Sequence, residues 1–229
     1  MSNGVPGIVV AVDGTSGSGK SSTSRGVADR LGLRYLDTGA MYRAMTWWML
    51  RHGVDVHDTV AVAARCGEPR LASGTDPLAP TITVDGEDVA IAIRQPDVNA
   101  AVSPVSAVPE VRARLLGIQR AAIDAALAGP GIVVEGRDIG SVVWPEATVK
   151  VYLSAEAFAR ATRRAAEEGG SDVETTRESL LARDQIDTGR TVSPLVMADG
   201  AVHIDTTAYS LDEVIDQVVA LVGAVRSSA

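Results

Sequence analysis

Hydrophobic and polar positions along the chain fall into two recurring patterns. Short uninterrupted apolar runs are typical of strands buried on both faces of a sheet, whereas apolar residues three or four apart indicate helices. The apolar runs predict five strands, at residues 7–13, 33–37, 131–138, 148–155 and 201–205. A helical pattern follows the first strand up to about Leu31 and recurs at residues 39–53, 57–65, 108–128, 156–168, 173–186 and 210–226. This alternation predicts an α/β fold, a five-stranded parallel sheet covered by helices.

The alternation is interrupted between residues 68 and 100. Residues 73–80 are rich in turn-forming types, and residues 81–93 show the pattern of a hairpin around Asp85-Gly86, a favoured two-residue turn. We therefore expect an inserted β-rich lobe at residues 68–100, with residues 1–67 and 101–229 forming the core.

Composition narrows the class of protein. The chain has 229 residues, of which 46% are hydrophobic, so it can bury a full core. A net charge of −8 argues against a broad surface for a nucleic acid polymer. The first apolar run, residues 8–12, is too short to cross a membrane. The single cysteine, Cys66, suits a reducing compartment, so we expect a cytoplasmic monomer with no membrane partner.

The turn after the first strand carries the strongest chemical signal. Residues 14–21, "GTSGSGKS", match G-x-x-x-x-G-K-S, and they lie between a predicted strand and a predicted helix. Glycines let several backbone N–H groups face phosphate oxygens, and the helix start adds its positive dipole end. Lys20 would reach the β- and γ-phosphates, and the Ser21 hydroxyl would ligate Mg²⁺. The segment predicts a nucleoside triphosphate site made of Gly14, Thr15, Ser16, Gly17, Ser18, Gly19, Lys20 and Ser21.

Several classes of triphosphate-binding protein remain to be separated. A GTP switch needs an N-K-x-D motif, yet neither Asn3 nor Asn99 precedes a lysine. A motor ATPase or translocase usually needs a longer chain and arginine fingers, although Glu135 at the end of a strand fits one of its motifs. A small-molecule kinase has the right size. A non-catalytic ATP-binding regulatory protein stays open as an alternative of a different class.

A kinase also needs an acceptor site, and in open α/β sheets ligands bind at the carboxyl ends of the strands. Asp37, Thr38 and Arg43 follow the second strand. Glu135, Arg137 and Asp138 follow the third. An arginine alone is weak evidence here, because only two of the 21 basic residues are lysines. Arginines that lie past strand ends beside a phosphate loop nevertheless predict a second anionic ligand.

At this point the chain resembles the bacterial cytidylate kinases, which belong to the nucleoside monophosphate kinase family. The matching segments include "DGTSGSGKSS", "YLDTGAMYR", "VPEVR", "GRDIGSVVWPEA", "KVYL" and "IDTT", in order over almost the whole chain. The resemblance implies a P-loop kinase in which residues 68–100 form the lobe that binds the nucleoside monophosphate (NMP) and residues 160–172 form a short lid. It implies phosphoryl transfer from ATP to CMP or dCMP, giving CDP or dCDP and ADP. A kinase of another small acceptor on the same fold is the alternative.

The resemblance also implies roles for individual residues. The acceptor phosphate would be held by Arg43, Arg137 and Arg190, with Thr38 nearby. Arg183 and Asp187 would meet the ribose side, and Arg183 would also approach phosphate. Ser103, Arg112 and Asp138 would contact the cytosine; the alternative for Asp138 is that it only orients Arg137 or Arg112. Ser22 would extend the phosphate loop, and the lid residues Arg160, Arg163 and Arg164 would reach ATP.

The expected mechanism is in-line transfer without a general base. The second pKa of a phosphate monoester is about 6, so the acceptor is already an anion at neutral pH. The difficulty is repulsion between two anions, and positioning with charge stabilisation overcomes it. We expect Lys20, Mg²⁺ and the arginines Arg43, Arg137, Arg183 and Arg190 to supply that charge. Asp13 or Asp37 either holds a Mg²⁺-bound water or caps a local turn.

Overall fold

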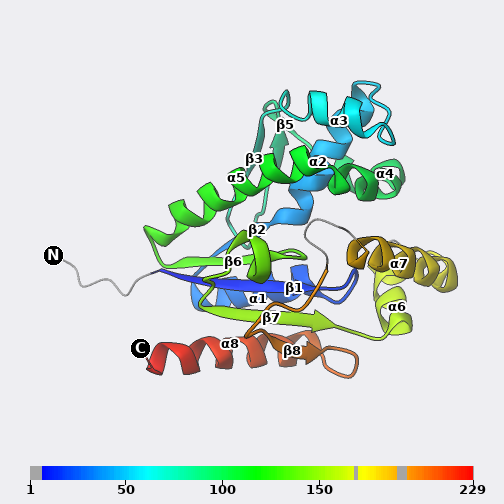
Figure 1. Ribbon diagram of the computed structural model, residues 1–229. Coiled ribbons are helices and arrows are strands. Elements are labelled where there is room, and N and C mark those ends of the chain that lie inside the picture. Colours follow the sequence, from blue (N-terminus) through cyan, green and yellow to red (C-terminus); the bar gives the residue numbers. More distant parts are fainter. Residues whose placement is uncertain (1–6, 168–169, 190–194, 229) are drawn as a thin grey trace.

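The computed structural model describes residues 7–167, 170–189 and 195–228 of the chain (Figure 1). A central sheet has the strand order β2-β6-β1-β7-β8, and all four strand pairs are parallel. The strands are β1 (Ile8–Gly14), β2 (Arg34–Asp37), β6 (Gly131–Glu135), β7 (Val149–Ser154) and β8 (Val202–Asp205). The five-stranded parallel sheet predicted from the apolar runs is confirmed.

The two faces of the sheet pack into separate cores, because successive side chains of a strand point to opposite faces. Val9 and Ala11 of β1 join one core and Val10 and Val12 join the other; none of the four is more than 2% exposed. The first core contains residues of α2 (Thr38–Arg51) and α5 (Pro109–Leu127). The second contains residues of α1 (Lys20–Leu31) and α8 (Leu211–Ser228). Burial on both faces explains why the strands are continuous apolar runs.

A small antiparallel sheet lies with three helical segments in the upper part of Figure 1. Its strands are β3 (Leu71–Ser73), β4 (Ile82–Val84) and β5 (Glu87–Asp88), and the helical segments are α3 (Thr59–Arg65), η1 (Ala92–Arg94) and α4 (Pro96–Ala107). Asp85 and Gly86 have φ values of 53° and 89°, as a type I′ hairpin turn requires. The predicted hairpin is therefore confirmed.

One helix of this upper part was not predicted. Helix α4 begins with Pro96 in its first turn and contains Pro104, a residue that usually ends a helical pattern. Residue 100, the expected end of the inserted lobe, falls inside this helix. That residues 68–100 act as a separate lobe stays a prediction.

The remaining elements frame the carboxyl edge of the central sheet. A short π-helical turn, η2 (Ile139–Val143), follows β6. Helices α6 (Ala157–Glu167) and α7 (Val173–Thr188) lie together beyond the tip of β7 (Figure 1). Helix α7 ends at Thr188, two residues beyond the end predicted from the sequence. Arg190 lies outside the described residues. None of the described helices is long and apolar enough to cross a membrane.

Candidate active site

The phosphate loop connects β1 to α1 and depends on glycine at several positions. Gly14 has φ 146°, and a Cβ atom there would lie 1.9 Å from the carbonyl oxygen of Leu153. Gly17 and Gly19 also have positive φ, 75° and 87°, which side-chain-bearing residues rarely adopt. Lys20 is the first residue of α1, and its Nζ donates to the carbonyl oxygen of Thr15 at 2.6 Å. Burial, and then the charge of Arg137, lowers the pKa of Lys20 to about 7.

A cavity of about 190 Å³ opens beside this loop at the carboxyl edge of the sheet. It joins the loop to most of the acceptor residues that the sequence analysis named. The cavity is lined by Ser16, Gly17, Lys20, Ser21, Thr38, Arg43, Ser103, Arg112, Arg137, Asp138, Arg164, Arg183 and Asp187. Residues far apart in the sequence are thus brought into one cleft. Arg160 and Arg163 do not line it.

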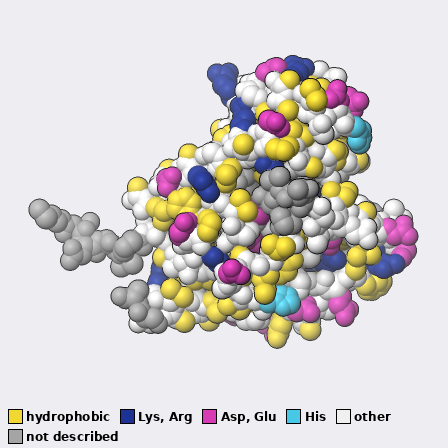
Figure 2. Space-filling model, viewed as in Figure 1, with side chains coloured by type: hydrophobic (Ala, Val, Ile, Leu, Met, Phe, Trp, Pro, Cys, Tyr) yellow, Lys and Arg dark blue, Asp and Glu magenta, His cyan; other side chains and the backbone are white. Residues whose placement is uncertain are grey.

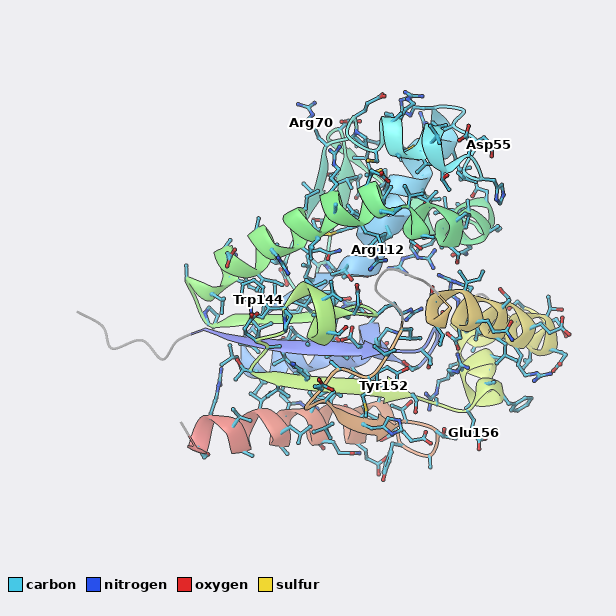
Figure 3. The ribbon with its side chains drawn as sticks, in the orientation of Figure 1. Asp55, Arg70, Arg112, Trp144, Tyr152 and Glu156 are labelled. Carbon is cyan, nitrogen blue, oxygen red and sulfur yellow. The ribbon has the colours of Figure 1, made fainter. Side chains whose placement is uncertain are left out.

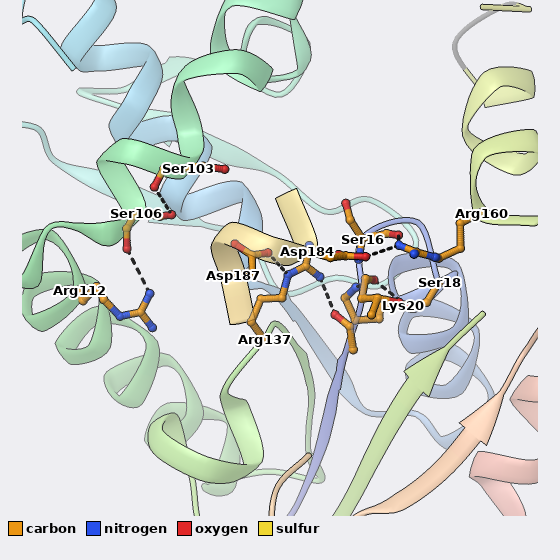
Figure 4. A network of polar contacts seen from close by, with 12 residues as sticks. Ser16, Ser18, Lys20, Ser103, Ser106, Arg112, Arg137, Arg160, Asp184 and Asp187 are labelled. Atoms are coloured by element: carbon orange, nitrogen blue, oxygen red, sulfur yellow. Dashed lines mark hydrogen bonds and ion pairs between the residues drawn. The ribbon is translucent and has the colours of Figure 1, made fainter. Parts of the chain in front are cut away.

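Two of the arginines that line the cavity, Arg137 and Arg43, donate to acceptors within the protein. Arg137 donates through Nε to Asp187 Oδ2 at 2.8 Å and through Nη1 to the carbonyl oxygen of Gly14 at 2.6 Å (Figure 4). Arg43 donates through Nη1 to the side-chain oxygen of Asn99 and to the carbonyl oxygen of Ile93. These contacts fix the direction of each guanidinium before an anion arrives.

Charge repulsion among the cations favours an anionic ligand. Burial, followed by repulsion from Arg183, lowers the pKa of Arg43 to about 9. The pKa of Arg183 is also lowered by burial, and next by Arg137. The Nε atom of Arg183 is buried and has no hydrogen-bond partner within the described part of the chain. A buried guanidinium nitrogen of this kind is expected to bind a ligand atom.

The far end of the cavity contains a buried ion pair. Arg112 Nη2 donates to Asp138 Oδ2 at 2.5 Å, and Arg112 Nη1 donates to the carbonyl oxygen of Ser106 at 3.2 Å. The guanidinium also lies over the ring of Tyr42, 5.5 Å from its centroid. Figure 3 shows Arg112 between the helices of the upper part and the sheet below. The contact that would let Asp138 orient Arg112 is therefore present without any ligand.

Two of the three lid arginines are linked to the phosphate loop, Arg160 directly and Arg163 through Thr206. Arg160 Nη1 donates to the carbonyl oxygen of Ser16 at 2.8 Å and to Asp184 Oδ2 at 2.5 Å. Asp184 Oδ1 in turn accepts from the backbone N–H of Ser16 at 3.0 Å. Arg163 donates to the hydroxyl and carbonyl oxygens of Thr206, at 3.0 and 2.6 Å. The Thr206 hydroxyl donates to the carbonyl oxygen of Ser18.

Glu135 is the main residue to which the sequence analysis gave no role. Its two carboxylate oxygens accept from the hydroxyls of Ser21, at 2.9 Å, and Tyr35. Burial, and then the nearby Asp37, raises the pKa of Glu135 to about 7. Because the Ser21 hydrogen points to Glu135, the Ser21 lone pairs remain for a cation. The residues present therefore fit Mg²⁺, which is typically held by a few protein oxygens and the substrate phosphates.

Asp13 and Asp37, the other acids considered for the cation, both bind backbone N–H groups. Asp13 accepts from Ile139 and Gly140, each at 2.8 Å. Asp37 caps α2 by accepting from Ala40 at 2.9 Å. The sequence analysis expected these acids either to hold a Mg²⁺-bound water or to cap a local turn. The structure shows capping hydrogen bonds for both.

A phosphate loop at the carboxyl edge of a parallel sheet, open to a cleft of arginines, defines a P-loop phosphotransferase. Two solved structures share this fold. An unliganded sugar kinase from Janibacter sp. has a TM-score of 0.51 at 16% identity, over 96% of this chain and 98% of that chain. An uncharacterized protein from Eubacterium ventriosum has a TM-score of 0.51 at 11% identity, over 94% and 98%. At such identities the likeness shows the fold alone.

Sequence relatives give the family. Residues 10–224 match the profile of the family described as Cytidylate kinase. A cytidylate kinase from Streptomyces coelicolor is 57% identical over 226 residues, 97% of each chain. A cytidylate kinase from Streptomyces avermitilis is 55% identical over 232 residues, 100% of each chain. This chain therefore belongs to the cytidylate kinase family.

Proposed function

We propose that the protein transfers the γ-phosphoryl group of ATP to CMP or dCMP, giving ADP and CDP or dCDP. The observation that carries this proposal is the shared cavity, in which Lys20 of the phosphate loop faces Arg43, Arg137 and Arg183. Lys20 would bind the phosphates of the donor, and the arginines would bind an anionic acceptor. Family membership supports cytidine nucleotides as the acceptors.

The chemistry follows from charge. An ionised acceptor phosphate needs no general base, so the residues must bring two polyanions together and stabilise the charge of the transferred group. Lys20 serves the donor phosphates, and Arg183, whose Nε lacks an internal partner among the described residues, serves the transferred group. Mg²⁺, when bound with ATP, neutralises further phosphate charge. Ser21 would ligate it, and Glu135 would orient Ser21.

The acceptor side divides into a phosphate end and a base end. Arg43 and Arg137 hold the acceptor phosphate, joined by Arg190 outside the described residues, with Thr38 at the start of α2 close by. Asp187 holds Arg137 and meets the ribose. Ser103, Arg112 and Asp138 contact the base. These assignments combine the family resemblance with the shared lining of the cavity.

The lid arginines have different roles in this proposal. Arg164 lines the cavity and is the lid residue that reaches the phosphates. Arg160 and Arg163 fix the loop from behind, through Ser16 and through Thr206. The cavity joins donor and acceptor residues within a single subunit, so we propose that the enzyme can act as a monomer. The buried thiol of Cys66 agrees with a cytoplasmic location. The face shown in Figure 2 has basic and acidic side chains interspersed, which suits a small-molecule enzyme better than one that binds a nucleic acid polymer.

A coupled assay tests the proposal. The purified chain is incubated with ATP and Mg²⁺ and with CMP, dCMP, UMP, AMP or GMP, and formation of ADP and of the diphosphate is measured. We expect rapid turnover with CMP and dCMP and slower turnover with the others. ADP formation without a nucleoside diphosphate product, or no ADP with any acceptor, would contradict the proposed function.

A further inference from the structure

The turn that carries Asp138 is capped in an unusual way. Asp138 occupies the position just before the π-helical turn Ile139–Val143, and its own side chain makes no capping hydrogen bond there. An aspartate in that position normally accepts from the first N–H groups of the helical turn. Here the Asp138 carboxylate is buried and binds Arg112 instead. Another acceptor must therefore satisfy the first N–H groups of the turn.

Asp13 is that acceptor. Its Oδ1 accepts from the N–H of Ile139 and its Oδ2 accepts from the N–H of Gly140, both at 2.8 Å. Asp13 ends the apolar part of β1, is 3% exposed, and does not line the cavity. A strand on the donor side of the site thus supplies the cap for a turn on the acceptor side.

The segment that leads into the turn, and the turn itself, are packed against several neighbours. The N–H of Gly136 donates to the carbonyl oxygen of Val12 at 3.0 Å, just before Asp13. At Gly140, a Cβ atom would lie 3.2 Å from Ala198 Cβ and from Lys150 Cδ. With the backbone fixed on either side, the direction of the Asp138 side chain depends on the two bonds from Asp13.

From this geometry we infer that Asp13 is a positioning residue for base selection. By capping the turn in place of Asp138, it leaves the Asp138 carboxylate to face Arg112 and the acceptor base. The inference rests on the proposed function of Asp138 as the group that contacts cytosine. A carboxylate accepts from the N4 amino group of cytosine, whereas it meets an unmatched oxygen in uracil.

The cap needs a carboxylate rather than an amide. Each oxygen of Asp13 binds a different N–H group, Oδ1 that of Ile139 and Oδ2 that of Gly140, and an asparagine supplies one oxygen and one NH₂ donor. In Asp13→Asn the turn therefore loses one bond and gains a contact between two donors. The Asp138 carboxylate would then rotate to cap its own turn, and its hold on Arg112 and on the base would weaken.

The experiment compares kcat/KM for CMP with kcat/KM for UMP in four purified enzymes: the wild type, Asp13→Asn, Asp138→Ala and the double variant. We expect Asp138→Ala to lower the CMP/UMP ratio by roughly ten-fold. Asp13→Asn should lower it by about five-fold or more, with the KM for ATP changed less than the KM for CMP. The double variant should show no further loss, because Asp13 acts through Asp138.

A matched control separates this role from the loss of any cap. Asp58 caps α3 by accepting from two successive N–H groups, those of Val60 and Ala61, at 3.0 and 3.1 Å. It is exposed and lies outside the cavity. One oxygen, Oδ1, accepts both bonds, so Asp58→Ala is the variant that removes this cap, and it should leave the CMP/UMP ratio unchanged. If Asp13→Asn does not fold, Gly140→Ala moves the same turn while leaving Asp13 intact and should lower the ratio as well.

The outcomes separate the positioning role of Asp13 from the reading of the base by Asp138. A lowered ratio in Asp138→Ala with a wild-type ratio in folded Asp13→Asn would overturn the positioning role and leave base reading by Asp138 in place. If Asp13→Asn does not fold, a wild-type ratio in Gly140→Ala would overturn it equally. An unchanged ratio in Asp138→Ala would overturn base reading and the inference together. Absence of CMP turnover in the wild type would contradict the proposed function itself.

Discussion

The donor and acceptor sides of the cavity are built in different ways. The donor side is one continuous loop, residues 14–21, whose backbone N–H groups and single lysine provide the positive charge. The acceptor side takes its side chains from α2, α4, α5, α7 and the segment after β6. Its positive charge comes from arginines that hold acceptors within the protein. A local motif fixes one half of the site, and long-range packing fixes the other.

The difference has a physical consequence. The loop needs only its own dihedral angles and the neighbouring strand to take shape. An arginine on the acceptor side needs a partner that holds its guanidinium in the right direction, as Asn99 does for Arg43 and Asp187 for Arg137. Substitutions on the donor side should therefore act through the substituted atom, whereas those on the acceptor side should also act through partners and packing.

The largest effect is expected at Lys20. Most basic residues of the chain are arginines, yet the phosphate loop has a lysine. A compact ammonium group fits a narrow nest of N–H groups, whereas a planar guanidinium does not. Lys20→Arg should lower kcat by about 100-fold or more while the protein stays folded. Steady-state kinetics and circular dichroism check both parts. Lys150→Arg, at the other lysine, is the matched control and should retain wild-type kinetics; near wild-type kcat in Lys20→Arg would refute the role.

Packing under the acceptor side gives the next effect. Ile93 is fully buried, and its carbonyl oxygen accepts from Arg43 at 3.3 Å. Ile93→Ala should lower the free energy of unfolding by about 2–4 kcal/mol and raise the KM for CMP more than the KM for ATP. Ile215→Ala, at a residue 4% exposed in the core on the opposite face of the sheet, should cost similar stability. Urea unfolding and steady-state kinetics are measured for both variants. If Ile93→Ala raised the KM for CMP and the KM for ATP equally, the donor and acceptor sides would not be independent as described.

Helix α7 carries one carboxylate for each side, three residues apart. Asp184 binds the N–H of Ser16 and Arg160, whereas Asp187 binds Arg137. Asp184→Asn should raise the KM for ATP, and Asp187→Asn the KM for CMP, each by about ten-fold, because each loses a charge-assisted bond. Initial rates with one substrate varied at a time measure this. If Asp184→Asn raised the KM for CMP and Asp187→Asn raised the KM for ATP, the proposed roles of the two carboxylates would be wrong.

The smallest effect concerns pH and Asp13, where the two sides meet. Burial raises the pKa of Asp13 to about 6, with Asp138 adding to the rise and the N–H groups of Gly140 and Ile139 and the Lys20 charge opposing it. The unfolded carboxyl titrates near 3.9, so between these values the folded state holds more protons than the unfolded state. Falling pH should therefore stabilise the wild type relative to Asp13→Asn, on the order of 1 kcal/mol between pH 7.5 and 4.5. Urea unfolding at both pH values measures the difference, and a change of opposite sign would show that the pKa of Asp13 is lowered, not raised, in the folded protein.

The same contrast explains which parts of the fold and of the site could be predicted from the sequence. The prediction of five core strands was correct, because burial on both faces of the sheet requires an uninterrupted apolar run. Strand β3, with three residues, and helix α4, with Pro104 inside it, carry no such pattern. The phosphate loop could be found from eight consecutive residues. Thr38, Arg43, Arg137 and Asp138 could be placed past strand ends from the strand pattern. The other acceptor residues were named only through the family resemblance, and the shared cavity depends on packing that no local pattern encodes.

The contacts around the site that the sequence analysis did not predict have one property in common. Glu135 meets Tyr35 because β2 and β6 are paired, although the two residues lie 100 positions apart. Asp184 meets Ser16 across 168 positions, and Thr206 meets Ser18 across 188. Each is an unremarkable polar residue in its own segment. Its role exists only once the strand order and the position of α7 are known.

The central place of β1 also constrains when the nucleotide loop can form during synthesis. β1 pairs with β6 on one side and β7 on the other, and the N–H of Val9 binds the hydroxyl of Thr148, 139 positions later. At about 5–20 residues per second, a ribosome needs roughly 7–28 s to make the intervening chain. For most of that time, until residue 131 has been made, the strand that carries the loop has neither of its neighbours. A nascent chain stalled before residue 131 should therefore fail to bind ATP, even though it already contains the whole loop motif.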